Sequence, residues 1–186
     1  MVRLHPDREQ ELAATQRIIQ AGVNCPQAGT AGRLFDTVSA MAGICREQTY
    51  EGQAAIELGA RAPGRLLPAY PFALGGETFS PALLLEAVLT DLELGTDAGE
   101  VAGRFLATVV AMLQSGARLA RERTGLNRVC LSGGTFLSPF LLHHVTAVLH
   151  NDGFEVFRHR AVPSGDGGLA LGQAMVARRR WQMQCV

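Results

Sequence analysis

The sequence predicts an α/β fold that begins with a helical segment. The first observation is the last third of the chain, which runs in the order strand, glycine turn, helix, strand, glycine turn, helix. The second is the first third, where apolar residues recur at helical spacing. The third is the length of 186 residues, enough for one ordinary domain with a hydrophobic core. We expect a helical segment over residues 1–65 and an α/β part over residues 66–186, joined in one compact domain.

Three helices are predicted in the first third, over residues 7–21, 34–45 and 53–60. Apolar residues mark one side of each of the first two helices. Gly22 is expected to end the first helix, and a loop with several turn residues follows it over residues 23–32.

The middle of the chain is predicted to begin with a hairpin. Its strands are expected over residues 66–74 and 77–79, and Gly75 with Gly76 would form the two-residue turn between them. Any boundary between the helical segment and the α/β part is expected near residues 63–67, where the helical pattern ends.

Two helices are predicted after the hairpin. Ser80 is the expected N-cap of the first, with Pro81 at its first helical position and its end near Gly95. The second is longer and runs over residues 98–123, stopped by Gly125. Its predicted buried side consists of Val101, Phe105, Val109, Met112 and Leu119.

Strands and helices alternate in the last third. Strands are predicted over residues 128–131 and 154–159, and helices over residues 136–151 and 170–180. Because ligands of open α/β sheets gather at the carboxyl ends of the strands, the two turns that follow these strands are the first places to search for a site.

Composition excludes several classes of protein. Lys plus Arg and Asp plus Glu are 17 each, so the chain lacks the net positive charge of a non-specific nucleic-acid binder. No apolar run approaches the ~20 residues of a membrane span, and Met1 is followed by charged residues rather than an apolar signal core. We therefore expect a soluble cytoplasmic protein with no nucleic-acid or membrane partner.

The four cysteines are predicted to be free thiols. Cys25, Cys45, Cys130 and Cys185 are scattered and form no C-x-x-C pair or zinc-type spacing. A chain of this length needs no disulfide for stability, which favours a reducing compartment.

The first glycine turn, Ser132-Gly133-Gly134-Thr135, follows a strand and precedes a helix. Free backbone N–H groups beside a helix start suit a phosphate, and glycine leaves room for its approach. A tight strand-to-helix turn without a ligand is an equally good interpretation of this pattern alone.

The second turn, residues 162–168, again lies between a strand and a helix. Asp166 could cap the helix, which is the favoured interpretation of the residue by itself, or offer an oxygen ligand to a metal ion. Two such turns in one α/β unit point to a ligand site more strongly than either does alone.

Other polar residues give weaker signals. The helical histidines His143, His144 and His150 lack the i, i+4 spacing of a metal pair, and we expect them to be solvated or packed. Ser132 and Cys130 have no neighbouring base in the sequence, so neither is predicted to be a nucleophile.

Several motifs in this sequence resemble those of a known protein family and occur in the same order as in that family. They are residues 31–36, residues 45–47 with 49–57, residues 131–136, residues 153–156, and residues 162–163 with 166–174. Together they resemble the HypF carbamoyltransferase family of NiFe-hydrogenase maturation, across nearly the whole chain.

The resemblance implies both a fold and a function. The chain would be the last lobe of a TsaD-like transferase domain, one lobe of an actin/sugar-kinase-type (RNase H-like) fold, with residues 66–186 as its nucleotide-binding part. Members of the family make carbamoyl-adenylate from carbamoyl phosphate and ATP. They pass the carbamoyl group to the C-terminal cysteine of a HypE-like partner.

The resemblance also implies site residues. Asp36, Gly52 and Glu57 would hold the ribose side of the adenylate, and Gly133 and Gly134 would lie against the nucleotide. Asp166 would be a ligand of a divalent metal, which reverses the preference for a helix cap. Catalytic residues are not predicted.

Three positions depart from the family pattern. Ser138 stands where the family has an asparagine that reaches the nucleotide, and Pro139 stands in place of an arginine. Leu106 follows Phe105, where the family commonly has histidine. A serine hydroxyl lacks the paired donor and acceptor of an amide, so these changes predict weaker nucleotide binding.

The family's other metal ligands, a His-x-x-x-His pair, belong to the opposite lobe, which this sequence does not contain. We therefore expect catalysis to need a second lobe, from another chain or from a homodimer. The alternatives are a non-catalytic binding module or degenerate paralogue that docks a hydrogenase-maturation partner, and a nucleotide binder with another substrate.

Overall fold

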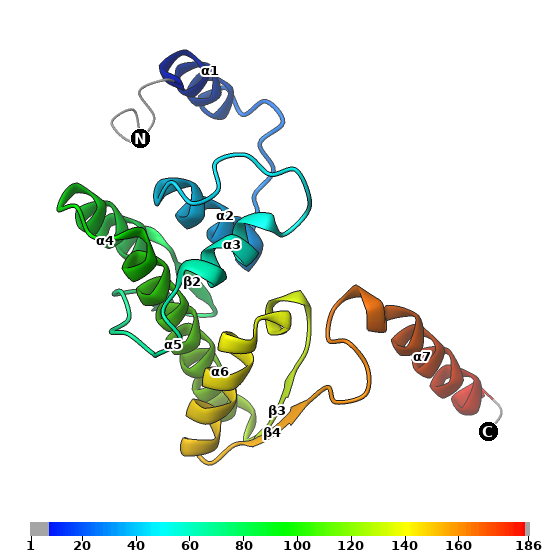
Figure 1. Cartoon of the computed structure of the whole chain (residues 1–186). Coiled ribbons are helices and arrows are strands. Elements are labelled where there is room, and N and C mark those ends of the chain that lie inside the picture. Colours follow the sequence, from blue (N-terminus) through cyan, green and yellow to red (C-terminus); the bar gives the residue numbers. More distant parts are fainter. Residues whose placement is uncertain (1–7, 185–186) are drawn as a thin grey trace.

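The computed structural model describes residues 8–184 and has a mixed α/β fold, as predicted (Figure 1). In chain order its elements are α1 (Glu9–Gln20), α2 (Ala31–Met41), α3 (Gln53–Arg61), β1 (Ala73–Gly75), β2 (Thr78–Ser80), α4 (Ala82–Glu93), α5 (Ala98–Thr124), β3 (Arg128–Leu131), the 3₁₀ helix η2 (Gly134–Leu137), α6 (Pro139–Asn151), β4 (Glu155–Arg158), the 3₁₀ helix η3 (Asp166–Gly168) and α7 (Leu169–Gln184). The predicted start of the first helix at Asp7 and the thiol of Cys185 lie outside the described residues.

Helix α5 is the central element of the fold. Helices α2, α3, α4 and α6 all pack against it, so it is enclosed in its first half on every side. The prediction of one buried side was therefore too narrow: between positions 101 and 110 only Arg104 is not buried. Met112 and Leu119, predicted on the buried side, are half-buried further along. Asp97 caps the helix start through a bond from the Gly99 N–H, and Gly125 ends it.

The core reaches from the first helices to the last strand. Phe35 on α2 packs edge to face against Phe105 on α5, with ring centroids 4.9 Å apart. Leu58 on α3 and Leu141 on α6 belong to the same buried cluster. The helical first third therefore shares one core with the α/β part.

The two sheets have two strands each. Strands β1 and β2 form an antiparallel hairpin, and β3 and β4 form a parallel pair in which Arg128 lies beside Glu155 and Leu131 beside Arg158. One face of the parallel pair carries Leu131 into the core. The opposite face exposes Cys130 and Phe157.

Three predictions about the middle of the chain need correction. The strand predicted over residues 66–74 exists only from Ala73, because Pro68 and Pro71 cannot donate to a ladder. The hairpin turn lies one residue later, at Gly76 and Glu77, since Gly75 pairs with Thr78. Pro81 takes the N-cap position and Ala82 the first helical one, so the start of α4 is also shifted by one residue.

Tyr70 anchors the irregular segment that replaces the predicted strand. Its N–H donates to Thr108 Oγ1 at 2.8 Å, and its hydroxyl donates to Asp91 Oδ2 at 2.7 Å. Burial and the bond to Asp91 hold the pKa of Tyr70 well above its usual range, so the phenol stays a neutral donor. The contacts of Tyr70, rather than pairing in a sheet, therefore hold this irregular segment in place.

The predicted helix over residues 136–151 begins later than expected. Residues Gly134–Leu137 form a 3₁₀ turn, and α6 starts at Pro139 with Ser138 as its N-cap. Proline at the first helical position loses no hydrogen bond, which explains the start at this residue. The strand predicted over residues 154–159 and the helix over residues 170–180 are found as β4 and α7.

Helices α1 and α7 project away from the other elements (Figure 1). Helix α1 has no buried residue. The described apolar side chains of α7 are largely exposed, with Trp181 at 71%. None of the helices in residues 8–184 is long and apolar enough to cross a bilayer.

A bidentate ion pair joins α5 to the end of α6 and predicts a pH dependence of stability. Arg118 donates to both carboxylate oxygens of Asp152, at 2.5 and 2.6 Å, and Gln114 donates to the same carboxylate. The bonds from Arg118 lower the pKa of Asp152. Because the pKa of Asp152 is lower in the folded chain than in the unfolded one, its ion pair contributes fully to stability above the unfolded pKa of about 4. This contribution is lost as the pH falls through the lower pKa of the folded state.

We expect the free energy of unfolding to fall less steeply below pH ~4 in Asp152→Asn than in the unmodified chain. Urea denaturation at a series of pH values checks this. Parallel curves for the two proteins would show that the ion pair contributes nothing to the acid sensitivity.

Candidate functional site

The structure brings the two glycine turns into contact. The first turn follows β3 and the second follows β4, and these strands are parallel neighbours. The Gly133 N–H donates to the carbonyl oxygen of Ser164 at 2.7 Å, which ties one turn to the other. Gly134 and Gly165 also lie against each other, since a side chain on Gly165 would meet the Gly134 Cα at 3.7 Å. Both turns therefore form one surface at the carboxyl ends of the strands.

Glycine is required at two points of this surface. Gly133 has a φ of +98°, a backbone conformation that other residues adopt only with strain. At Gly168 an added Cβ would lie 2.4 Å from the carbonyl oxygen of Pro163. Gly134 differs, because nothing lies within 4 Å of the place where its Cβ would be. The turns thus leave no room for a side chain at Gly168, whereas the space beside Gly134 is open.

Asp166 opens the 3₁₀ helix η3, and its side chain is exposed. The interpretation of Asp166 as a helix cap is not supported, because no side-chain bond caps this turn and η3 is preceded by Gly165. Within the part of the chain that the structure describes, the carboxylate has no hydrogen-bond or ion-pair partner. It is free to accept a cation.

Sequence reasoning missed a contact beside the turns. His159 Nε2 lies 3.0 Å from Ser132 Oγ, although the two residues are 27 positions apart. They line a pocket of about 570 Å³ together with Gly165, Gly172 and Arg180. Ser132 showed no base in the neighbouring sequence, and only the parallel pairing of β3 and β4 supplies one. The pair has the reach of a proton-transferring hydrogen bond.

The other predicted residues form a second cluster on α2 and α3. Asp36 Oδ1 accepts a hydrogen bond from Gln48 Nε2 at 2.9 Å. Its buried Oδ2 forms an ion pair with Arg33 Nη2 at 2.9 Å and accepts no hydrogen bond from residues 8–184. Glu57 accepts a bond from Gln53 Nε2 at 2.7 Å. Both carboxylate oxygens of Asp36 therefore have a protein contact, and Oδ2 is shielded from solvent.

The thiol of Cys45 lies near both carboxylates of this cluster. Burial raises the pKa of its thiol, and the nearby charges of Glu57 and Asp36 raise it further. Gly52 stands at the N-cap position of α3, one turn before Glu57, with a φ of +81°. The structure therefore brings Asp36, Gly52 and Glu57 together on one pair of helices, and Gly133, Gly134 and Asp166 together on the turns. The contacts found for each set stay within that set.

The chain has a clear counterpart among known proteins. The family described as "Carbamoyltransferase, Kae1-like Domain, second subdomain" matches residues 2–173, which is most of the sequence. The chain belongs to this family. The resemblance to HypF and the predicted fold class are thereby confirmed.

Individual relatives agree with the family. The Carbamoyltransferase HypF of Rhizobium leguminosarum bv. viciae is 36% identical over 83% of this chain and 20% of that protein. The Carbamoyltransferase HypF homolog of Cupriavidus necator is 34% identical over 92% of this chain and 46% of that protein. The chain thus spans one fifth to about one half of the length of these HypF relatives.

Solved structures match as well. A full-length HypF in the phosphate- and nucleotide-bound form is 34% identical, with a TM-score of 0.85 over 92% of this chain and 23% of that one. HypF of T. kodakarensis has a TM-score of 0.76 at 23% identity and so supports the fold alone. The chain therefore contains a domain that is similar to part of the HypF carbamoyltransferases.

Two of the three positions that depart from the HypF pattern have a structural role in this chain. Ser138 is the N-cap of α6, and its Oγ accepts a bond from the Leu141 N–H at 3.4 Å. Leu106 is 1% exposed and belongs to the core. At both positions the side chain serves the fold of this HypF-type lobe.

The metal implied by the HypF resemblance is not matched by a full ligand set. Residues 8–184 hold no group of three or more His, Cys, Asp or Glu side chains that could bind an ion. Asp166 offers one carboxylate, which is too few ligands for a resident divalent metal. The described residues therefore do not fit a metal centre by themselves.

Replacing Ser138 separates capping from ligand binding in this HypF-type lobe. Ser138→Ala should lower the free energy of unfolding by about 1 kcal/mol, because the cap is lost. Ser138→Asn keeps a capping oxygen and adds an amide, so we expect stability to be retained and nucleotide affinity to rise several-fold. Thermal melts and nucleotide titrations of both variants measure the two effects; an unchanged affinity in Ser138→Asn would mean that this side chain does not face the nucleotide.

Proposed function

We propose that this chain holds the nucleotide of a carbamoyl-adenylate and presents its carbamoyl group to the C-terminal cysteine of a HypE-like maturation protein. The observation that carries the proposal is the joined pair of glycine turns. Gly133 ties them at 2.7 Å, Gly134 faces open space, and Asp166 keeps a free carboxylate. Backbone without side chains beside an open space suits the approach of a phosphate.

Two further points support nucleotide binding. Asp36 and Glu57 place two carboxylates on neighbouring helices, and carboxylate oxygens are acceptors for the hydroxyl groups of a ribose. The full-length HypF that matches 92% of this chain was solved in a phosphate- and nucleotide-bound form. We propose that Asp36, Gly52 and Glu57 lie on the ribose side, with Gly133, Gly134 and Ser138 along the rest of the nucleotide.

The proposed reaction is an acyl transfer to sulfur. The partner's cysteine thiolate attacks the carbamoyl carbon, a C–S bond forms, and the C–O bond to the adenylate phosphate breaks. The thiol proton leaves to solvent when the thiolate forms, and the nucleotide leaves as AMP with the electron pair of the broken C–O bond. The role of this chain is to fix the adenylate so that the carbamoyl carbon stays at the open side of the turns.

A second lobe is part of the proposal. ATP or carbamoyl-adenylate would bind with a divalent metal, for which Asp166 gives one ligand and the other lobe gives the rest. The parallel strands β3 and β4 are covered on one face, whereas parallel sheets are almost always covered on both. The exposed face with Cys130 and Phe157 supports docking of a further lobe, from another chain or a second copy, in the cytoplasm.

The test is transfer of labelled carbamoyl from the adenylate to the cysteine of a HypE-like protein. We expect this chain to be inactive alone and active when mixed with a HypF relative truncated to remove the matched part. The truncated relative by itself is the control. No transfer by the mixture, under conditions where full-length HypF succeeds, would contradict the catalytic proposal.

A second candidate function is a non-catalytic module that docks a hydrogenase-maturation partner. The observation that favours it is Ser138, whose hydroxyl already caps α6. A module of this kind would bind the HypE-like protein without binding ATP, so a nucleotide titration separates the two candidates.

A further inference from the structure

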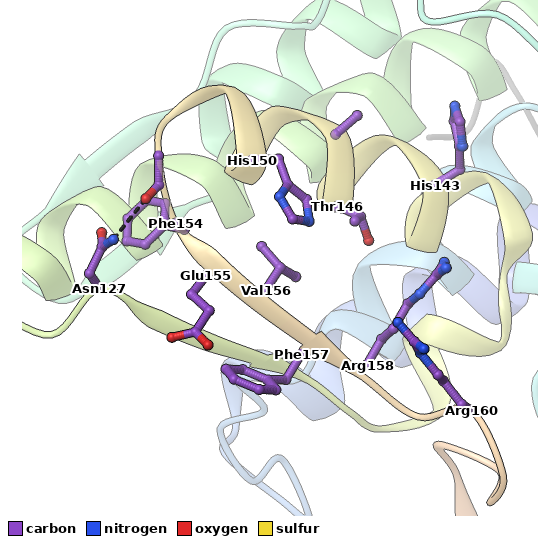
Figure 2. Close-up of a pocket in the computed structure, with 12 residues that line it drawn as sticks. Asn127, His143, Thr146, His150, Phe154, Glu155, Val156, Phe157, Arg158 and Arg160 are labelled. Atoms are coloured by element: carbon purple, nitrogen blue, oxygen red, sulfur yellow. Dashed lines mark hydrogen bonds between the residues drawn. The ribbon is translucent and has the colours of Figure 1, made fainter.

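A second hollow lies on the side of the lobe formed by α6 and β4. It has a volume of about 880 Å³, and none of its lining residues belongs to the glycine turns. Figure 2 shows it as a groove with β4 along one side and α6 above. At one end Asn127 Nδ2 donates to the Gly153 carbonyl oxygen at 2.7 Å, the dashed line in the figure. At the other end the groove opens between His143, Arg158 and Arg160.

The groove runs along a free strand edge. Strand β4 pairs only with β3 among the described strands. The Glu155 N–H donates to the Asn127 carbonyl oxygen at 2.9 Å, so Glu155 directs its backbone groups toward β3. In a parallel ladder the alternate residues, Val156 and Arg158, then direct their N–H and C=O groups outward. An edge of this kind is a template for an added strand.

The helix side of the groove can take side chains. Thr146, Ala147 and His150 of α6 line it, and Val156 of β4 points toward them (Figure 2). A strand edge beside a shallow, partly apolar helix face is the arrangement in which an extended peptide pairs through its backbone and places alternate side chains in a groove. The ligand class is therefore an extended segment rather than a helix.

The charges of the groove favour an acidic ligand. Arg158 and Arg160 line the groove, are exposed and make no ion pair within residues 8–184. The one carboxylate among the lining side chains, Glu155, is held by Arg128 at 2.8 Å. The open end therefore presents unpaired positive charge.

We propose that this groove binds an extended acidic peptide segment of a protein partner as an additional strand on β4. The backbone of Val156 and Arg158 supplies the pairing, and Arg158 and Arg160 select carboxylate side chains. This inference does not depend on nucleotide binding, because it uses no residue of the turns.

The experiment uses the full chain and a blocked, fluorescently labelled peptide that alternates glutamate and valine. We expect saturable binding by fluorescence anisotropy, weakening as salt rises from about 50 to 500 mM. Hydrogen exchange should slow at the amides of Val156 and Arg158. A lysine–valine peptide should bind at least about tenfold more weakly.

Two controls separate backbone pairing from charge. A glutamate–valine peptide that is N-methylated at alternate residues should lose binding, because it cannot donate to β4. Arg158→Glu with Arg160→Glu should lower affinity at least about tenfold, whereas Arg178→Glu with Arg179→Glu on α7 changes the net charge equally and should leave it within about twofold.

Circular dichroism should show both double variants folded, since all four arginines are exposed. The proposal would be overturned if the glutamate–valine and lysine–valine peptides bound with equal affinity. It would also be overturned if the N-methylated glutamate–valine peptide bound as tightly as the unmethylated one. Protection of amides elsewhere in place of those on β4 would overturn it too.

Discussion

Phe105→Ala should lower the free energy of unfolding by about 3–5 kcal/mol. The ring is fully buried at 0% exposure and packs edge to face on Phe35. A domain is usually stable by about 5–15 kcal/mol, so this one change removes a large share of the total. Because Phe35 belongs to the helix that carries Asp36, we expect the same cavity to loosen the cluster on α2 and α3 as well.

Urea denaturation measures the effect of Phe105→Ala. Leu113→Ala is the matched control, because Leu113 lies on the same helix and is 36% exposed. We expect the control to lose less than about 1 kcal/mol. Similar losses for both variants would show that α5 is not the centre of the core.

Gly168→Ala should disrupt the second glycine turn. The new methyl group would lie 2.4 Å from the Pro163 carbonyl oxygen, and a backbone atom at that distance cannot give way without moving the loop. We expect a loss of about 1–3 kcal/mol in unfolding free energy. The displaced loop carries the Ser164 carbonyl that holds Gly133, so nucleotide affinity should fall at least about tenfold, or 1.4 kcal/mol.

Gly172→Ala is the control for this change. Gly172 lies one helical turn further along, and an added Cβ meets nothing within 4 Å. Alanine favours a helix by up to about 1 kcal/mol over glycine, so the control should be as stable as the unmodified chain or slightly more stable. A Gly168→Ala protein that melts and binds like the control would contradict the geometry of the turn.

The site on the turns could be predicted in part from local sequence. The strand over residues 128–131 and the long helix before it were found as predicted, because each has a regular apolar pattern and a glycine at its boundary. Both turns were predicted to follow strands of one α/β unit, and in the structure the bond from Gly133 to Ser164 joins them. Whether these residues bind a nucleotide stays a prediction.

Other features required tertiary information. Ser132 and His159 meet only because β3 and β4 are parallel neighbours, a pairing that no local pattern specifies. The apolar content of the segment around Tyr70 predicts a strand. Its prolines cannot donate to a strand ladder, and the bond from the Tyr70 hydroxyl to Asp91 holds the segment in an irregular conformation. The resemblance predicts a nucleotide contact at Ser138, whereas the structure shows its hydroxyl as the N-cap of α6, directly before Pro139.

The most direct test of the nucleotide site is calorimetric titration of the full chain with ATP and Mg²⁺. Gly134→Ala and Gly29→Ala are compared with the unmodified protein, because an added Cβ at either position meets nothing within 4 Å and leaves the fold intact. We predict saturable binding with a dissociation constant of about 100 μM or tighter, near −5.5 kcal/mol, for the unmodified chain and Gly29→Ala, and at least about tenfold weaker binding for Gly134→Ala. No saturable heat, or equal affinity in all three proteins, would contradict the assignment of the glycine turns to the nucleotide.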